Sequence, residues 1–168
     1  MFIDETGLNT KLARLYGRSP RGERCLSAIP HGHWQSSTFL AALRHDQITA
    51  PFLVDGPLDA EVFGVYLQRV LVPCLQAGDT LILDNLATHK IQGVAPLLRA
   101  KSVELRYLPP YSPDLNPIEP AFAKLKAHLR QAAARTGEQL VTAVADSLDT
   151  FPAADCRAFF RQARYASI

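Results

Sequence analysis

Three acidic residues in the chain could together hold divalent metal ions. Asp4 lies in the first apolar stretch, Asp84 directly follows the apolar run 81–83, and Glu119 follows a proline-rich segment. Carboxylate oxygens are the ligands that hard divalent cations prefer. Two such ions about 3.5 to 4 Å apart can orient an attacking oxygen and offset the charge at a phosphorus atom. The three acids therefore predict a site for two Mg²⁺ or Mn²⁺ ions and for chemistry on a phosphodiester.

The places of these acids in the chain matter more than their spacing. The sequence has 16 acidic residues, so the 34 residues between Asp84 and Glu119 could arise by chance. An acid within a first strand, one at a strand end and one at a helix start can converge on one edge of a sheet. Other chemistries are less well supported, because the chain has no Gly-x-Ser-x-Gly elbow and no His-Glu-x-x-His helix. The glycines in 17–22 resemble a P-loop, but Glu23 and Arg24 stand where that loop needs Lys and Ser or Thr.

The first predicted element must aim only one of two adjacent acids at the site. Residues 2–6 alternate as a strand does, so Asp4 shares a face with Phe2 while Glu5 points the other way. We therefore assign Asp4, and not Glu5, to the predicted metal site.

The remaining pattern predicts an α/β domain with a central mixed sheet, antiparallel in its first strands and then parallel, flanked by helices. Further strands are expected at 25–30, 36–44, 48–54, 81–83 and 103–107, with helices from Asp59 to Gly78 and over 91–101. The uninterrupted apolar run 81–83 is typical of a strand covered on both faces. Two more helices are predicted after residue 138, with a break at Phe151-Pro152.

The helix that carries the third acid is predicted to begin at Asn116. Asn is a good N-cap, Pro117 suits the first helical position, and Glu119 would then complete a capping box. Glu119 could therefore cap the helix instead of binding metal. Glu119, Lys126 and Arg130 fall on one side of this helix, which favours a surface that handles phosphate.

Length and composition indicate a globular protein. The 168 residues are 48% hydrophobic and 20% charged, enough for one domain with a buried core. No apolar run reaches the roughly 18 residues of a membrane span, and the start of the chain lacks the pattern of a signal peptide. We therefore expect a cytoplasmic protein without a membrane partner. Its three cysteines are far apart and predict neither a disulfide framework nor a zinc ribbon.

Charge is distributed unevenly along the chain. Residues 45–89 carry one basic and six acidic residues, whereas residues 90–135 carry eight basic and three acidic residues. A basic surface beside an acidic site suits a polyanion held near metal ions. Ordinary solvated helix faces would give a similar count.

Several motifs resemble those of the DDE transposases of the mariner superfamily, in particular the bacterial insertion-sequence branch. They are Asp4-Glu5-Thr6, the loop 17–22, Asp84-Asn85 with His89-Lys90, and Pro109-Pro110-Tyr111-Ser112-Pro113-Asp114-Leu115-Asn116-Pro117-Ile118-Glu119. The last of these is long and specific, and together they cover nearly the whole chain. The resemblance implies an RNase H-like fold in which Asp4, Asp84 and Glu119 are the catalytic, metal-binding acids.

The resemblance also implies an activity and partners. Members of the family nick the ends of a mobile element with a metal-activated water, and the freed 3′-hydroxyl then attacks target DNA, often at a TA dinucleotide. Double-stranded DNA and further copies of the chain are the implied partners, and DNA binding would place the protein at the nucleoid. The implied DNA contacts are His89, Lys90, Lys124, Lys126 and Arg130.

The expected organisation is an RNase H-like catalytic domain over 1–135 and a C-terminal helical extension over 136–168 packed on it. Full-length relatives carry helix-turn-helix domains before the catalytic core, whereas here Met1 immediately precedes the first strand. The resemblance thus predicts that recognition of element ends is missing or is encoded separately. Two alternatives remain: a catalytically silent remnant that binds DNA or other transposase chains, and an RNase H-like nuclease for RNA hybrids or junctions, against which 111–119 argues.

Overall fold

A computed structural model of the chain describes residues 1–14, 16–26, 30–31, 33–84 and 94–165. The predicted DNA contacts His89 and Lys90 lie outside these residues. No helix in the described ranges has both the length and the hydropathy required of a membrane span.

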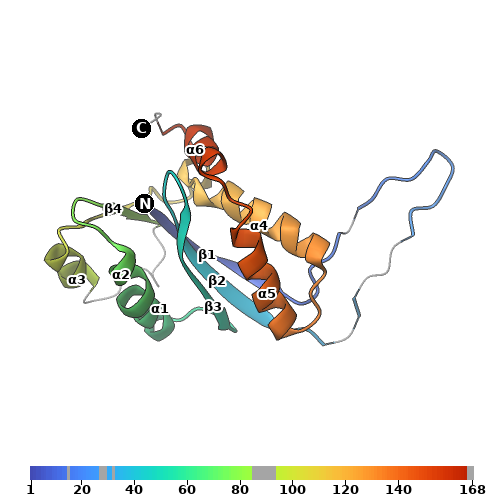
Figure 1. Ribbon diagram of the computed structural model, residues 1–168, viewed down its shortest axis with the longest axis horizontal. Helices are drawn as coiled ribbons and strands as arrows, with labels where there is room; N and C mark the ends of the chain where they lie inside the picture. Colours follow the sequence, from blue (N-terminus) through green and yellow to red (C-terminus); the bar gives the residue numbers. More distant parts are fainter. Residues whose placement is uncertain (15, 27–29, 32, 85–93, 166–168) are drawn as a thin grey trace.

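A five-stranded mixed sheet forms the centre of the molecule (Figure 1). Its order is β3-β2-β1-β4-β5, with antiparallel pairing of β1 to β2 and of β2 to β3 and parallel pairing of β1 to β4 and of β4 to β5. The strands are β1 (Phe2–Asn9), β2 (Ser36–Leu43), β3 (Ile48–Asp55), β4 (Thr80–Leu83) and β5 (Glu104–Tyr107). The predicted mixed sheet, antiparallel first and then parallel, is confirmed.

Helices cover both faces of this sheet (Figure 1). One face carries α1 (Ala60–Tyr66), the π-helical turn η1 (Leu67–Leu71), α2 (Val72–Cys74) and α3 (Val94–Ala100). The other carries α4 (Ile118–Ala132), α5 (Gly137–Leu148) and α6 (Ala153–Gln162). The helix predicted from Asp59 is confirmed, because Asp59 caps α1 by accepting a hydrogen bond from the Val62 N–H at 2.8 Å.

Strand β2 shows why the core has two halves. Phe39 and Leu43 are buried against α4 and α5, while Leu40 and Ala42 are buried against the helices of the opposite face. Both sides of the strand are therefore apolar, as expected for a strand with helices on each face. The two clusters pack on opposite faces of the central strands and so fix the positions of these strands.

The strand predicted at 25–30 is wrong for the residues that the structure describes there. Cys25 and Leu26 are exposed and belong to no strand. Both edges of β2 are already paired, with β1 on one side and β3 on the other, so no place remains beside β2 for another strand. The apolar composition of this short run favoured a strand that the sheet cannot accept.

The described residues between 11 and 35 instead belong to a long excursion between β1 and β2, which we call the basic arm. Figure 1 shows it extending far from the body of the molecule. Its base is closed by hydrogen bonds from the Thr10 N–H to the Gln35 carbonyl at 3.1 Å and from the Gln35 N–H to the Thr10 hydroxyl at 3.2 Å. The Arg135 guanidinium also donates to the carbonyls of Thr10 and Leu12. The arm therefore leaves the body at a point fixed by the loop after α4.

Candidate active site

Asp4 is the most rigidly held acid of the predicted site. It lies in the central strand β1 and is only 7% exposed. Its Oδ1 accepts the Glu5 N–H at 2.8 Å, and its Oδ2 accepts an amide N–H of Asn116 at 2.7 Å. Each oxygen thus has one donor and keeps a second lone pair for a ligand.

Asp84 is brought beside Asp4 by the register of two parallel strands. Phe2 of β1 pairs with Ile82 of β4. Asp4 lies two residues after Phe2 and Asp84 lies two residues after Ile82, so both acids come at the same level on adjacent strands. This arrangement follows from the sheet order and needs no side chain to adjust it.

The proline-rich loop between β5 and α4 forms the rim of the site. It contains the short 3₁₀ turn η3 (Pro113–Leu115), and its Tyr111 is fully exposed with a left-handed φ of 56°. Such a backbone angle is unfavourable for a bulky residue and persists only where the surrounding chain fixes it. Tyr165, after α6, donates its hydroxyl to the Leu115 carbonyl at 2.9 Å. The C-terminal segment therefore helps to hold this loop.

The capping box predicted for α4 is wrong. The helix begins at Ile118 with Pro117 as its N-cap, and no side chain caps it. Asn116 turns its side chain to Asp4 and contributes only its carbonyl to the helix start, accepting the Glu119 N–H at 3.2 Å. The Asn116 NH₂ donates to Asp4, while the side-chain oxygen that would accept in a capping box has no hydrogen-bond partner in the described part of the chain. Glu119 is exposed in the first turn, free of the predicted capping partner.

The three predicted acids line one cavity of about 430 Å³. Its lining consists of Asp4, Asp84, Glu119, Asn116, Ser112 and residues 108–111 and 113. No Lys, Arg or His is among these lining residues, so three carboxylates share the cavity without a cationic side chain in its described wall. Burial raises the pKa of Asp4 to about 7, and the negative charges of Glu5, Glu119 and Asp84 contribute to this rise. The site therefore has a net negative charge that a bound cation would offset.

The three carboxylates share the cavity, not a single coordination sphere. Among the described residues, no group of three or more His, Cys, Asp or Glu side chains is arranged to hold one metal ion. Two ions about 3.5 to 4 Å apart do not require this, because acids at opposite ends of the pair need not reach the same ion.

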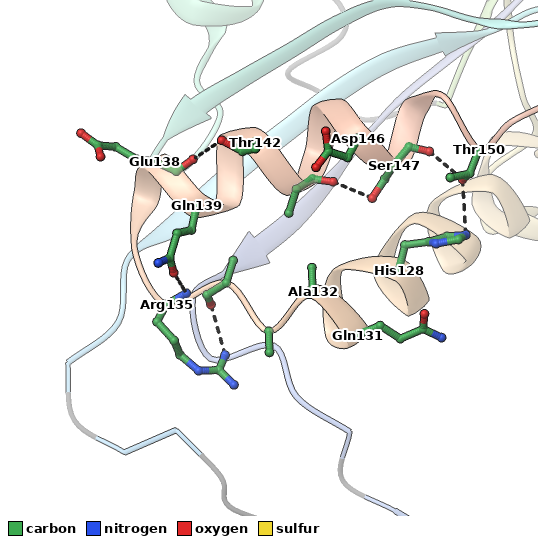
Figure 2. Close-up of a pocket in the computed structure, with 13 residues that line it drawn as sticks. His128, Gln131, Ala132, Arg135, Glu138, Gln139, Thr142, Asp146, Ser147 and Thr150 are labelled. Atoms are coloured by element: carbon green, nitrogen blue, oxygen red, sulfur yellow. Dashed lines mark hydrogen bonds between the residues drawn. The ribbon is translucent and has the colours of Figure 1, made fainter.

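A second and larger hollow, about 1000 Å³, lies between the end of α4 and α5 (Figure 2). His128, Arg135, Glu138 and Asp146 are among its lining residues. Figure 2 shows His128 on α4, Arg135 in the loop that follows it, and Glu138 and Asp146 on α5. We place the chemistry in the smaller cavity, because there several acids from different elements meet.

The predicted basic contacts have different surroundings. The Lys124 ammonium pairs with Asp155 at 2.7 Å, donates to the Thr150 carbonyl and lies over the Phe151 ring. Lys124 thus fastens α4 to the segment before α6, and we do not carry it into a DNA-binding surface. Lys126 is half-buried and Arg130 is exposed on α4.

The basic arm is the feature that sequence reasoning did not use. Its residues 11–26 include five basic residues, Lys11, Arg14, Arg18, Arg21 and Arg24, and one acid, Glu23. The four arginines are exposed, as is Tyr16. At the base of the arm, the Lys11 ammonium lies 3.8 Å from the centre of the Trp34 ring. A charge count over this shorter window would have revealed the concentration of basic residues in the arm.

Residues 1–141 match the family model of the DDE superfamily endonucleases. The chain belongs to this family. Because the match covers most of the sequence, it includes all three predicted acids. A search of curated proteins finds no match for this DDE endonuclease chain.

Solved structures show the same fold. The Mos1 transposase paired-end complex with its left transposon end aligns over 96% of this chain with a TM-score of 0.70 and 16% identity. The Mos1 strand transfer complex aligns over 98% with a TM-score of 0.65 and 16% identity. The catalytic domain of Mos1 mariner transposase aligns over 97% of this chain and 75% of its own length, with a TM-score of 0.60 and 15% identity. The DDE endonuclease chain therefore has the RNase H-like fold, as predicted, and it spans about half of the Mos1 chains in the two complexes, 51% and 52%.

Proposed function

We propose that this chain is the catalytic core of a transposase, which cleaves DNA and joins it to a target with the help of two divalent metal ions. One observation carries the proposal: in a chain of the DDE endonuclease family, Asp4, Asp84 and Glu119 come from three separate elements and line one cavity without a cation in its described lining. The proposed metals are Mg²⁺ or Mn²⁺. Mos1, whose fold the chain shares, has been solved as paired-end complexes with each of these metals.

The donor set fits these ions. All three side chains offer carboxylate oxygens, which suit hard cations, and their mutual repulsion at the cavity is what a cation relieves. When bound, two such ions activate the attacking oxygen and stabilise the charge that develops at the phosphorus. Asp4 would hold its position through its two hydrogen bonds, whereas Asp84 and Glu119 would close the site from the strand end and the helix start.

The reaction has two steps of the same kind. Water attacks a phosphodiester at the element's end, which breaks the bond to the 3′ oxygen and leaves a free 3′-hydroxyl. That hydroxyl then attacks a phosphodiester of target DNA. One new bond from its oxygen to phosphorus forms, and the bond from that phosphorus to the target's 3′ oxygen breaks, which leaves a 3′-hydroxyl on the target strand. The proline-rich loop lines the cavity in which these steps would occur, and its Tyr111 is exposed.

The proposed partner is double-stranded DNA, bound by basic residues that are not among the described lining of the cavity. The candidates are the basic arm together with Lys126 and Arg130 of α4 and the undescribed His89 and Lys90. The DNA in the Mos1 complexes supports this partner. We further propose that the chain acts as a homo-oligomer at the nucleoid in the cytoplasm. In this scheme, helix-turn-helix segments outside these 168 residues recognise the element ends.

Removing two charges from the basic arm should weaken DNA binding in a salt-dependent way. The double variant Arg18→Gln, Arg21→Gln loses up to two phosphate contacts, so the slope of log affinity against log salt should fall by up to about 2. Fluorescence anisotropy with a labelled duplex between about 50 and 200 mM salt measures this slope. The control is Arg157→Gln with Arg161→Gln, an equal charge change at exposed positions of α6. Equal slopes in the two double variants would remove the arm from the DNA-binding surface.

The central test is nicking of supercoiled plasmid in Mn²⁺ by the wild-type chain and by Glu119→Gln. We expect the variant to lose nicking by about 100-fold or more, since it replaces a charged oxygen ligand with a neutral amide. Its melting temperature should stay within a few degrees of wild type, because Glu119 is exposed and takes no part in a capping box.

Glu138→Gln is the matched control for this experiment. Glu138 holds the same position in the first turn of α5 that Glu119 holds in α4, two residues after the N-cap, and it is also exposed. It should nick plasmid as fast as wild type. If Glu119→Gln nicks normally, Glu119 is not part of the site. If the folded wild type does not nick, two interpretations remain: a silent remnant, or a core that needs a separately encoded partner to hold DNA.

A further inference from the structure

Asn116 makes a side-chain contact of very long range at the predicted site. Its amide Nδ2 donates to Asp4 Oδ2 at 2.7 Å, across 112 residues of sequence, and both groups are buried. The Asp4 carboxylate accepts a second hydrogen bond from the neighbouring Glu5 N–H. Asn116 therefore ties the Asp4 side chain to the loop and helix on the far side of the cavity, which the bond from Glu5 within β1 cannot do.

The side-chain oxygen of Asn116 is in a situation that is rare for a buried polar atom. Asn116 is 4% exposed, and its Oδ1 is buried without a hydrogen-bond partner in the described part of the chain. A buried acceptor without a partner costs on the order of 1–3 kcal/mol, so such groups are rare unless they serve a purpose. An apolar residue of similar volume would avoid this cost. Position 116 nevertheless holds an asparagine, and within the described residues its side-chain amide forms a hydrogen bond with Asp4.

The helix start does not explain the asparagine. The N-cap of α4 is Pro117, and Asn116 assists the helix only through its main-chain carbonyl, which any residue would provide. Its backbone N–H donates to the Pro113 carbonyl at 3.0 Å, also independently of the side chain. The Asn116 side chain therefore does not cap the helix, and its described hydrogen bond is made to the site.

We propose that Asn116 is a positioning residue of the metal site: its amide fixes the Asp4 carboxylate so that each oxygen keeps one lone pair for a metal ion in the cavity. This inference rests on the proposed function, because it requires that Asp4 binds metal. Partners that orient a metal-binding group typically change metal affinity by about 10- to 100-fold when removed. Asn116 lines the same cavity as the three acids, as this role requires.

The test is the affinity for Mn²⁺ of Asn116→Leu, measured by the electron paramagnetic resonance signal of free Mn²⁺ during a titration. Leucine keeps the volume and removes both the donor and the unpaired acceptor, so the melting temperature should change little. The dissociation constant for Mn²⁺ should rise about tenfold or more. Plasmid nicking should fall at low Mn²⁺ and recover in part at high Mn²⁺. A merely structural residue would not give this metal-dependent recovery.

Ser147→Ala is the control, because Ser147 is equally buried and loses a hydrogen bond to Ala143 of the same helix, at a position that does not line the cavity. It should bind Mn²⁺ as wild type does. Asn116→Ala is a second variant in case leucine packs badly. Equal Mn²⁺ affinity in wild type and both Asn116 variants overturns the inference, and so does loss of folding in both, since Asn116 would then be a structural residue. A folded wild type that does not bind Mn²⁺ overturns the proposed function itself.

Discussion

Asp84→Asn is expected to lower plasmid nicking by about 1,000-fold or more while the protein stays folded. Metal ions typically supply several kcal/mol of transition-state stabilisation, and each step of about 1.36 kcal/mol corresponds to a factor of ten in rate. Asp84 is the last described residue before the gap at 85–93 and lies just beyond β4, so its replacement leaves the strand pairing intact. The measurement is the rate of nicking in Mn²⁺, together with the melting temperature.

Asp114→Asn separates this effect from a general loss of negative charge. Asp114 lies in η3 of the proline-rich loop and is exposed, but it does not line the cavity. The same substitution there removes the same charge close to the site, and nicking should remain near the wild-type rate. Comparable nicking by wild type and Asp84→Asn would exclude Asp84 from the proposed set of metal ligands.

Asp4→Asn is expected to stabilise the metal-free fold and to abolish cleavage. Burial raises the pKa of Asp4 from 3.8 to about 7, so between these pH values the folded state binds a proton that the unfolded chain releases. The free energy of unfolding of wild type should therefore fall as pH rises from about 4 to 7. Asparagine avoids this loss, which is on the order of 4 kcal/mol. Urea unfolding in EDTA at about pH 5 and about pH 8 should show the difference mainly at the higher pH.

The hydrogen bonds at this position are compatible with the substitution. The introduced asparagine side chain can still accept the Glu5 N–H. After rotation of the Asn116 amide, the NH₂ of the asparagine introduced at position 4 can also donate to the Asn116 side-chain oxygen. In the described part of the wild-type chain this oxygen lacks a partner. The substitution therefore removes a buried charge and leaves one end of the Asn116 amide without a described partner, as in the wild type.

Asp79→Asn serves as a control of opposite sign. The Arg44 guanidinium binds Asp79 through two hydrogen bonds and lowers its pKa. That variant should lose stability at neutral pH, where the wild-type carboxylate is charged and paired. A wild-type stability that does not fall toward about pH 8 would contradict the account of Asp4.

Much of the fold and the meeting of the acids could be predicted from local pattern. Two-residue alternation identified Asp4 over Glu5, and an acid after a short apolar strand identified Asp84. Both inferences depend only on residues that are close together in the sequence. Sequence periodicity contains this kind of information. Their convergence in one cavity then followed from the parallel pairing of β1 with β4.

The sequence was least informative where a distant residue binds a side chain. The sequence Asn116-Pro117-Ile118-Glu119 fits a capping box, but it does not show that the Asp4 carboxylate lies within reach of the same amide. Lys124 and Lys126 are equivalent in sequence, yet it is Lys124 that meets Asp155 from α6. Local chemistry could not separate these cases, because the deciding partners are 112 and 31 residues away.

Because of the sheet order, the cavity proposed to act on DNA is assembled only late in folding. β1 is synthesised first but lies in the middle of the sheet. The surroundings of Asp4 are complete only when β4, Asn116 and the first turn of α4 are in place. Contacts between residues so far apart in sequence form late, because a long loop must close before they give any stabilisation. A ribosome-bound or partly unfolded chain therefore carries the acids without the assembled cavity. The proposed cleavage activity would thereby be confined to molecules that have completed folding.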